Sequence, residues 1–375
     1  MTTVSPRVLV IVEQLRRATP GGIGTYVRGL LQGLRSLGTD EGLDVELLAS
    51  RRPRNRDGSP DPLDALGYPV RTSVLPAPAM TRAWDHGLLR APPGFEVVHA
   101  TSMATPEPGR AALVSTVHDL LWRRVPAAYP DRGRAWHEAA LQRALRRADR
   151  FIVPADVVAA DLSEAGATLD AITVIPMGCD HLPPPDLAAG SALLARLGVD
   201  GPFLLSVGTL EPRKNLFRLT EAYQRIRRSL PEPWPLVVVG PAGWGERLEP
   251  EPGVVLAGMV APEELSALYA TTRLLAYVPL IEGFGLPPVE AMSFGAPVVA
   301  SPLPSTGQAA FEVDPNDTDS IAQGLLTVAT DDSERLRLRH DGFRRSAELS
   351  WSTIAHSHLA VWNEAAASRP DRRHG

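Results

Sequence analysis

The sequence has little of what marks several large protein classes. Cysteine occurs once in 375 residues, as Cys179, which excludes an internal disulfide framework and a cysteine-rich zinc site. Basic residues are not in excess: 38 Lys and Arg stand against 43 Asp and Glu, and the net charge of −5 argues against a general nucleic-acid binder. Apolar runs such as Leu236–Val239 are far shorter than the ~20 residues of a membrane span, and no signal-peptide pattern opens the chain. We therefore expect a soluble, cytoplasmic protein with no nucleic-acid partner.

Lysine is also nearly absent. Lys214 is the one lysine among the 38 basic residues, so the other 37 are arginine. A genome that favours arginine codons explains this on a solvated surface, where the two side chains exchange readily. They do not exchange where a compact, flexible ammonium is needed instead of a planar guanidinium. The remaining lysine is therefore a candidate functional residue, although composition alone does not separate this from codon usage.

The order of apolar segments predicts an α/β protein. A single core stops growing near ~250–300 residues, so a chain of 375 favours two domains. Arg7–Glu13 has strand length, and a Pro-Gly-Gly turn separates it from Ile23–Leu37, whose apolar residues recur at helical spacing. Further predicted strands are Val45–Ala49, Val97–His99, Leu113–Val117, Phe151–Val153, Thr173–Ile175, Phe203–Val207, Leu236–Val239, Val254–Ala257, Leu274–Val278 and Val298–Ala300.

Helical patterns alternate with several of these strands, for example Leu216–Leu230 and Pro262–Ala270. Such alternation indicates parallel sheets covered by helices on both faces. The fold class is therefore α/β, with two doubly wound, Rossmann-like domains facing each other across a cleft and a linker near Pro183–Pro185. The expected parts are two domains and a final helix with a tail, 1–183, 184–350 and 351–375.

The segment Gly208–Asn215 (GTLEPRKN) follows a predicted strand and opens a predicted helix. Arg213 and Lys214 are therefore expected at the carboxyl edge of the second sheet, where open α/β sheets bind ligands. Two cations beside a helix N-terminus, which adds free N–H groups and about half a positive charge, suit a diphosphate. A solvated Arg-Lys pair on a loop would look the same, and the scarcity of lysine favours the functional interpretation.

A second polar segment, Glu282–Glu290 (EGFGLPPVE), lies between a predicted strand and a short predicted helix. Its two prolines suit the first helical turn, which places Glu290 in that turn, and Gly283 and Gly285 let the backbone approach a ligand. A carboxylate there can accept two hydroxyl hydrogen bonds, as recognition of a ribose requires. The alternative is an acid that stabilises the helix dipole by ~0.3–1 kcal/mol.

Two carboxylates spaced as E-x7-E, at this distance after Glu-Pro-Arg-Lys-Asn, resemble the retaining glycosyltransferases of family four, which have the GT-B fold. The resemblance runs from Val8 to about Ala366, and the order of the motifs is more specific than any single one. It implies that the N-terminal domain faces the acceptor, that the C-terminal domain binds the nucleotide sugar, and that the helix Trp351–Ala366 crosses back to the N-terminal domain. Further matching segments are Gly21–Gly24, Thr116–Asp119, Val174–Gly178, Gly240–Trp244, Gly258 and Glu263–Leu265.

The resemblance also implies a role for each matching position. Arg213 and Lys214 would bind the donor diphosphate and offset the charge on the departing nucleotide, while Glu290 would hold the ribose hydroxyls. His118 would lie near the anomeric carbon and bond a sugar hydroxyl, although a histidine at a strand end can also be structural. The implied catalytic residues are His118, Arg213, Lys214 and Glu282. The implied donor-binding residues are Gly22, Gly24, Met259, Val260, Phe284, Gly285, Leu286 and Glu290.

These residues differ in the part of the donor that they would contact. Glu282 and the backbone of Phe284–Leu286 would contact the donor sugar and the phosphates. Gly22 and Gly24 would let the first loop approach the phosphate and the transferred sugar. The base would rest against Gly258–Val260.

The chemistry needs no further group. Cleavage at the anomeric carbon leaves negative charge on the diphosphate, which fixed cations and helix N–H groups stabilise. No cofactor is expected, and a metal is not implied, because the one Asp-x-Asp, Asp317–Asp319, is predicted to cap a helix. The family's usual course is attack on the same face, with a donor phosphate oxygen taking the acceptor proton.

The donor and acceptor are less defined than the reaction. Resemblance to bacterial mannosyltransferases that build surface polysaccharides favours GDP-mannose, with UDP or another nucleotide as the alternative. The acceptor would be a glycan, a lipid-linked molecule or a small molecule. The arginine-rich segment Arg132–Arg150 is either one solvated helix face or a contact with the inner membrane surface.

The chain departs from the family between Ser301 and Ala310, where it is about four residues shorter and Ser305 stands in place of the usual acid. Other classes fit less well. A nicotinamide dehydrogenase would need a third glycine where Val27 stands, no P-loop motif occurs, and epimerases and phosphorylases of this fold match E-x7-E less closely. A non-catalytic sugar-nucleotide binder remains the alternative outside enzymes.

Overall fold

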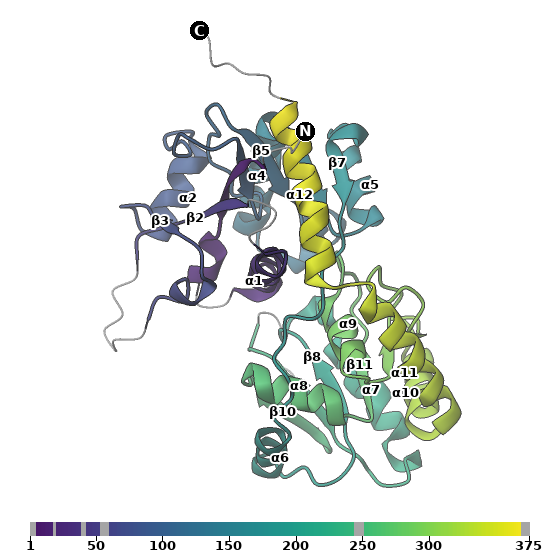
Figure 1. Cartoon of the computed structure of the whole chain (residues 1–375). Helices are drawn as coiled ribbons and strands as arrows, with labels where there is room; N and C mark the ends of the chain where they lie inside the picture. Colours follow the sequence, from purple (N-terminus) through teal and green to yellow (C-terminus); the bar gives the residue numbers. More distant parts are fainter. Residues whose placement is uncertain (1–4, 18–19, 39–42, 53–59, 244–250, 369–375) are drawn as a thin grey trace. The chain divides into compact units, whose positions relative to one another are not determined.

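The structure is a computed structural model that describes residues 5–17, 20–38, 43–52, 60–243 and 251–368. The chain divides into two compact parts. Unit 1 comprises Met1–His181 and Trp351–Gly375, and unit 2 comprises Leu182–Ser350 (Figure 1). The first boundary falls two residues before the one placed at 183 from the sequence.

Unit 1 is built on a seven-stranded parallel sheet in the order β3-β2-β1-β4-β5-β6-β7. Both β4 and β5 are buried at every position, because helices cover the two faces of a parallel sheet. The strands are β1 (Arg7–Ile11), β2 (Asp44–Ala49), β3 (Val70–Thr72), β4 (Val97–Ala100), β5 (Ala112–Thr116), β6 (Arg150–Val153) and β7 (Ile172–Val174). The helices are α1 (Gly21–Ser36), α2 (Ala77–Asp85), α3 (Leu121–Arg124), α4 (Asp131–Arg147), α5 (Asp156–Glu164) and α12 (Trp351–Ala367).

Unit 2 repeats this architecture with a six-stranded parallel sheet in the order β10-β9-β8-β11-β12-β13. Its core lies between the sheet and helices such as α7 and α10. The strands are β8 (Leu204–Val207), β9 (Leu236–Val239), β10 (Val254–Gly258), β11 (Leu274–Tyr277), β12 (Val298–Ala300) and β13 (Phe311–Glu312). The helices are α6 (Leu187–Arg196), α7 (Leu216–Ile226), α8 (Pro262–Thr271), α9 (Leu286–Ser293), α10 (Thr318–Thr330) and α11 (Asp332–Ala347).

The predicted and observed elements differ in a few places. The sequence does not predict β3 and β13, which are edge strands of three and two residues and too short to show a period. The Pro-Gly-Gly segment predicted as a turn is instead the start of α1. The amide of Gly24 donates to the Pro20 carbonyl at 3.2 Å, which closes the first helical turn two residues earlier than predicted.

The last helix, α12, drawn in yellow in Figure 1, packs on α1 of unit 1. A Cβ at Gly29 would lie 2.0 Å from Cε2 of Trp351, and one at Gly33 would lie 2.1 Å from the Trp351 carbonyl oxygen. Gly178 meets the same indole, with 2.7 Å from a Cβ to Cδ2. The Trp351 amide donates to Asp180 at 2.8 Å. Glycine is therefore required at all three positions for the helix to dock.

The arginine-rich segment forms α4 and is largely engaged within unit 1. Arg143 pairs with Asp85, to which Trp136 also donates at 3.1 Å, and Arg147 pairs with Glu107 at 2.5 Å. These contacts tie α4 to α2 and to the segment before β5. None of the described helices combines the length and apolarity that a membrane crossing requires.

Candidate active site

In unit 2 the predicted diphosphate-binding segment lies where β8 ends. Pro212–Lys214 forms one 3-10 turn between β8 and α7. Asn215 follows in the left-handed region (φ 59°), and its side-chain amide donates to the carbonyls of Val278 and Pro315 at 3.0 and 2.7 Å. These bonds fix the turn to the carboxyl end of β11, which holds its two cations at the edge of the sheet.

The two predicted cations and the first predicted glutamate meet at one atom. Oε1 of Glu282 accepts hydrogen bonds from Lys214, from Nη1 of Arg213 at 2.7 Å and from the Tyr277 hydroxyl at 2.9 Å. Lys214 also donates to the Tyr277 oxygen at 2.9 Å, and Arg213 pairs with Glu211 at 2.5 Å. The side chains of Arg213, Lys214 and Glu282 are 15, 14 and 11 % exposed, so the charges are strongly shielded yet still reach the surface.

The carboxylate of Glu282 is ionised at neutral pH. Burial alone would raise the pKa of Glu282, but the charges and hydrogen bonds of Lys214 and Arg213 outweigh burial and lower that pKa. Burial, and then the charge of Glu282, raises the pKa of Tyr277 well above its usual value. Among the described residues, Tyr277 and Glu282 take two of the three N–H donors of Lys214, which leaves one for a ligand oxygen.

The second predicted glutamate lies in α9. The prediction that Glu290 is in the first helical turn is wrong: α9 begins at Leu286, before the two prolines, so Glu290 is the fifth residue and the first turn contains no acid. Because the helix dipole acts within the first turn, dipole stabilisation does not explain this carboxylate. Tyr269 donates to Oε2 of Glu290 at 2.9 Å. Burial, and then the Glu290 charge, raises the Tyr269 pKa well above its usual value, so the hydroxyl stays protonated and orients the carboxylate.

The start of α9 requires glycine. Gly285 has φ 89°, and a Cβ there would lie 3.2 Å from Leu303 and 3.3 Å from Oγ of Ser305. Ser305 belongs to the connection between β12 and β13 and is fully buried. This connection therefore packs directly against the glycine at which α9 starts.

The remaining donor-side positions differ in what they can offer. Phe284 and Leu286 are buried, at 4 and 9 % exposure, and their side chains are apolar, so only their backbone can offer hydrogen bonds to a ligand. Met259 is 73 % exposed after β10, beside the half-buried Val260 and the open space around Gly258. Of the predicted motif Gly240–Trp244, the final tryptophan lies outside the described residues.

In unit 1, His118 follows β5 with a defined tautomer. Its Nε2–H donates to the Thr101 carbonyl at 2.9 Å, so the neutral ring presents an acceptor at Nδ1. Burial lowers the pKa of His118, although the Thr101 bond and the neighbouring Asp119 oppose the shift. The edge-on ring of Tyr26 in α1, with centroids 4.9 Å apart, packs against the imidazole. A neutral His118 can accept a hydrogen bond from a hydroxyl group, as the predicted sugar contact requires.

The two predicted glycines of unit 1 are not equivalent. Gly22 is exposed, and a Cβ there would meet nothing within 4 Å. At Gly24 a Cβ would lie 2.3 Å from Cβ of Pro20, so the first turn of α1 itself requires this glycine. Ligand approach stays a prediction for both, and Gly24 has a sufficient structural reason.

Behind His118, a buried hydrogen-bond chain joins four elements of unit 1. His358 donates from Nδ1 to the Ile354 carbonyl at 2.7 Å, so its Nε2 accepts from the Tyr26 hydroxyl at 2.7 Å. Thr116 then donates to Tyr26 at 2.9 Å and accepts from Nε2 of His99 at 2.8 Å. The chain runs from β4 through β5 and α1 to α12, and every member is at most 2 % exposed.

The tyrosines that support the site are not among the residues predicted from the sequence. Tyr277 is the last residue of β11 and precedes Glu282 by five positions, so its place at the carboxyl edge was a usable signal. Tyr269 and Tyr26 occupy buried helical positions and cannot be distinguished by pattern from core residues.

No group of three His, Cys, Asp or Glu side chains in the described ranges is arranged to hold a metal ion. Asp317 caps α10 by accepting the Asp319 amide at 2.9 Å, which confirms the prediction for the Asp-x-Asp pair. That the reaction needs no metal stays a prediction.

Two family models match the chain, the glycosyltransferase family 4 model over residues 20–181 and the glycosyl transferases group 1 model over residues 196–345. The O-antigen chain mannosyltransferase B of Escherichia coli is 32 % identical over 64 % of this chain and 66 % of its own length. The match to the E. coli serotype-specific mannosyltransferase WbdA covers 20–25 % of that protein, so the chain spans at most about two-thirds of these relatives.

Other relatives match over nearly their whole length. The MMP alpha-(1->4)-mannosyltransferase of Mycolicibacterium hassiacum is 28 % identical over 92 % of this chain and 95 % of its own. The D-inositol 3-phosphate glycosyltransferase of Xylanimonas cellulosilytica is 27 % identical over 99 % of both. Among solved structures, Anabaena HepE in complex with UDP-glucose has a TM-score of 0.71 at 20 % identity and covers 97 % of this chain and 100 % of its own, which supports the fold. The chain therefore belongs to the glycosyltransferases of family four, is an enzyme with the GT-B fold, and is similar to bacterial mannosyltransferases.

Proposed function

We propose that this glycosyltransferase moves a mannosyl group from GDP-mannose to a glycan, lipid-linked or small-molecule acceptor, with retention of the anomeric configuration. The observation that carries the proposal is the cluster in which Arg213 and Lys214 share Oε1 of Glu282 at the carboxyl edge of the sheet. Mannosyltransferases among the relatives favour mannose and growth of a polysaccharide.

The cluster suits a departing diphosphate. As the bond to the anomeric carbon breaks, charge grows on the phosphate oxygens, and cations already held in place stabilise it without reorganisation. Glu282 keeps Lys214 from swinging into solvent, and the remaining N–H of that lysine is available to a phosphate oxygen. Transfer on the same face needs no protein nucleophile, since a donor phosphate oxygen can take the acceptor proton.

Other residues would recognise the ends of the donor. Glu290, oriented by Tyr269, would accept hydrogen bonds from the two ribose hydroxyls. Met259 and Val260 would contact the base, and the backbone from Phe284 to Leu286 would contact the sugar and phosphates. In unit 1, Nδ1 of His118 would accept a sugar hydroxyl.

A second candidate donor is a UDP-sugar. A solved structure with the same fold holds UDP-glucose, and one D-inositol 3-phosphate glycosyltransferase matches over 99 % of this chain. In that case the acceptor would be a small phosphorylated polyol. The two candidates differ in the base and share the diphosphate cluster.

A thermal-shift panel of GDP, UDP, ADP and NAD, with the corresponding nucleotide sugars, separates the candidates. A ligand at 100 times its Kd stabilises the folded state by ~2.7 kcal/mol. We expect the largest shift from GDP and GDP-mannose, lost in Glu290→Ala. A dominant shift from UDP would select the second candidate, and firm binding of NAD alone would overturn the proposal. With an acceptor in hand, the anomeric proton coupling of the product tests retention.

A further inference from the structure

A hollow lies in unit 2 at the edge of the sheet away from the candidate active site. It has a volume of about 410 Å3. Pro202, Arg273 and Pro297, which precede β8, β11 and β12, contribute to its lining. The strands are parallel, so these amino ends lie at the opposite edge from Lys214, which follows β8 at its carboxyl end. The hollow is therefore separate from the donor site.

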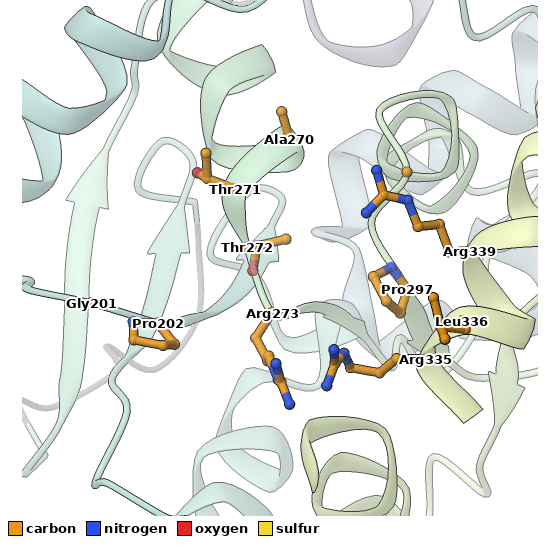
Figure 2. Close-up of a pocket in the computed structure, with 11 residues that line it drawn as sticks. Gly201, Pro202, Ala270, Thr271, Thr272, Arg273, Pro297, Arg335, Leu336 and Arg339 are labelled. Atoms are coloured by element: carbon orange, nitrogen blue, oxygen red, sulfur yellow. The ribbon is translucent and has the colours of Figure 1, made fainter. Parts of the chain in front are cut away.

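The lining of this hollow is strongly cationic. Arg273, Arg335 and Arg339 contribute to it, and none of the described lining residues is acidic. Figure 2 shows the guanidinium groups of Arg273 and Arg335 directed toward each other, with Arg339 beyond Pro297. The nearby Asp332 bonds Arg273 at 3.2 Å and also pairs with Arg335. One carboxylate thus serves two of three cations, so these four side chains together carry a net charge of +2.

The crowding of these cations is only partly relieved. Burial, and then the charge of Arg335, lowers the pKa of Arg273 despite the opposing effect of Asp332. Arg339 lies over the ring of Phe343 at 5.7 Å and has no carboxylate within ion-pair distance among the described residues. Arg273 also has structural contacts, with the Ala329 carbonyl at 2.9 Å and the Trp234 ring at 5.2 Å. Arg335 and Arg339 are therefore the cations most available to a ligand.

We propose that this hollow binds a small phosphate-bearing molecule. Guanidinium groups match phosphate oxygens with paired, charge-assisted hydrogen bonds, and a bound phosphate would balance the surplus charge. The volume suits a small molecule instead of a polymer. Pro202, Pro297 and the 67 % exposed Leu336 offer an apolar wall for the carbon part of a phosphate ester. The same chemistry would accept either a free phosphate ester or a phospholipid headgroup.

Isothermal titration with glycerol 3-phosphate tests the site, with Lys214→Ala as the background so that the donor cluster does not contribute. We expect binding that is about tenfold or more weaker in Arg335→Gln/Arg339→Gln, because two charge-assisted contacts are lost. The matched control is Arg337→Gln/Arg344→Gln, which removes two exposed arginines of the same helix and should leave the affinity unchanged. Asp332→Asn, which keeps all three arginines, should tighten binding.

Sedimentation with vesicles separates the two sources of phosphate. Binding to phosphatidylglycerol vesicles but not to phosphatidylcholine vesicles, lost in Arg335→Gln/Arg339→Gln, would assign the site to a lipid headgroup. Binding of glycerol 3-phosphate without vesicle binding would assign it to a free ester. Equal behaviour of wild type, the double variant and Asp332→Asn toward every probe would overturn the proposal. If the double variant folds poorly, Asp332→Asn decides, because it retains all three arginines, and an affinity unchanged from its parent protein would overturn the proposal.

Discussion

The two units each contain a polar cluster, and the two clusters are built on opposite principles. In unit 2, Arg213, Lys214 and Glu282 are charged, share one oxygen atom and remain 11–15 % exposed. In unit 1, the chain from His99 to His358 consists of neutral groups and is sealed from solvent. Each hydrogen bond of this buried chain has one donor and one acceptor, so the chain stabilises one arrangement of the helices. A charged cluster that stays accessible is instead prepared for a charged ligand.

The difference separates function from support. Buried ion pairs are weak devices for stability, because desolvation offsets the Coulomb attraction, so the unit 2 cluster is better explained by its ligand. The neutral chain joins α1 to α12 through the hydroxyl of Tyr26 and the ring of His358. The ring of the same tyrosine packs on His118. Unit 1 thus uses its polar chain to hold a candidate site residue in place.

The largest expected effect is on the charged cluster. Lys214→Ala removes a cation from the departing diphosphate, and we expect kcat/KM to fall by about 10^3-fold, or ~4 kcal/mol, with the fold retained. Lys214→Arg keeps the charge but not the compact ammonium and should lose less, about 10–10^2-fold. Arg225→Ala, which removes an exposed cation of α7, is the matched control and should leave activity unchanged. Full activity of Lys214→Arg would mean that this position does not require lysine and that codon usage alone explains the lysine count.

The next largest effect is expected in the pH dependence of the free energy of unfolding, to which the two clusters contribute differently. Burial lowers the pKa of His358 from 6.5 to about 4. Between pH 6.5 and 4 the His358 ring is therefore protonated more readily in the unfolded chain than in the folded one. The contribution of the neutral ring to the free energy of unfolding is fully present above pH 6.5, and roughly 3 kcal/mol of it is lost as the pH falls to 4. Glu282 has a pKa below its usual 4.5, so its contribution is complete above 4.5 and is lost only at lower pH.

Chemical denaturation of wild type and His358→Gln between pH 7 and 4 measures this difference. The free energy of unfolding of the wild type should decline more steeply than that of the variant. Parallel curves would mean that His358 does not titrate in this range and that the chain is not sealed as described.

A smaller effect is expected at the hydroxyl that links the chain. Tyr26→Phe leaves the Thr116 hydroxyl without an acceptor and Nε2 of His358 without a donor, which should cost ~1–3 kcal/mol in the free energy of unfolding. The phenyl ring stays beside His118, so kcat/KM of the folded protein should hold. Tyr68→Phe is the control, since its hydroxyl bonds the Leu31 carbonyl from a half-buried position. A loss of activity without loss of stability in Tyr26→Phe would make this tyrosine part of the chemistry.

The sequence indicates the open cluster better than the sealed one, for a physical reason. Parallel strands bring their carboxyl ends to one edge, so Lys214 and Glu282 are expected to meet although 68 residues separate them. The sealed chain depends on side chains from four elements, with Tyr26 and His358 separated by 332 residues. No local period marks such partners. The supporting role of Tyr269 and the start of α9 at Leu286 likewise follow from packing.

The fold was predictable where apolar segments were long enough to show a pattern. Central strands such as β9 match the prediction residue by residue, while the edge strands β3 and β13 are too short to be seen. The contacts that dock α12 could not be predicted from the sequence. Gly178 is far from Gly29 and Gly33 in the chain, and only the structure shows that all three pack against Trp351.

In the proposed reaction, the cluster of Arg213 and Lys214 binds the diphosphate of the donor. Isothermal titration of the preferred nucleoside diphosphate and of its monophosphate, on wild type and on Lys214→Ala, measures it directly. We expect wild type to bind the diphosphate about tenfold or more tightly than the monophosphate, since the second phosphate gains charge-assisted bonds. Lys214→Ala should lose most of this preference. An equal preference in the two proteins would contradict this role of the cluster.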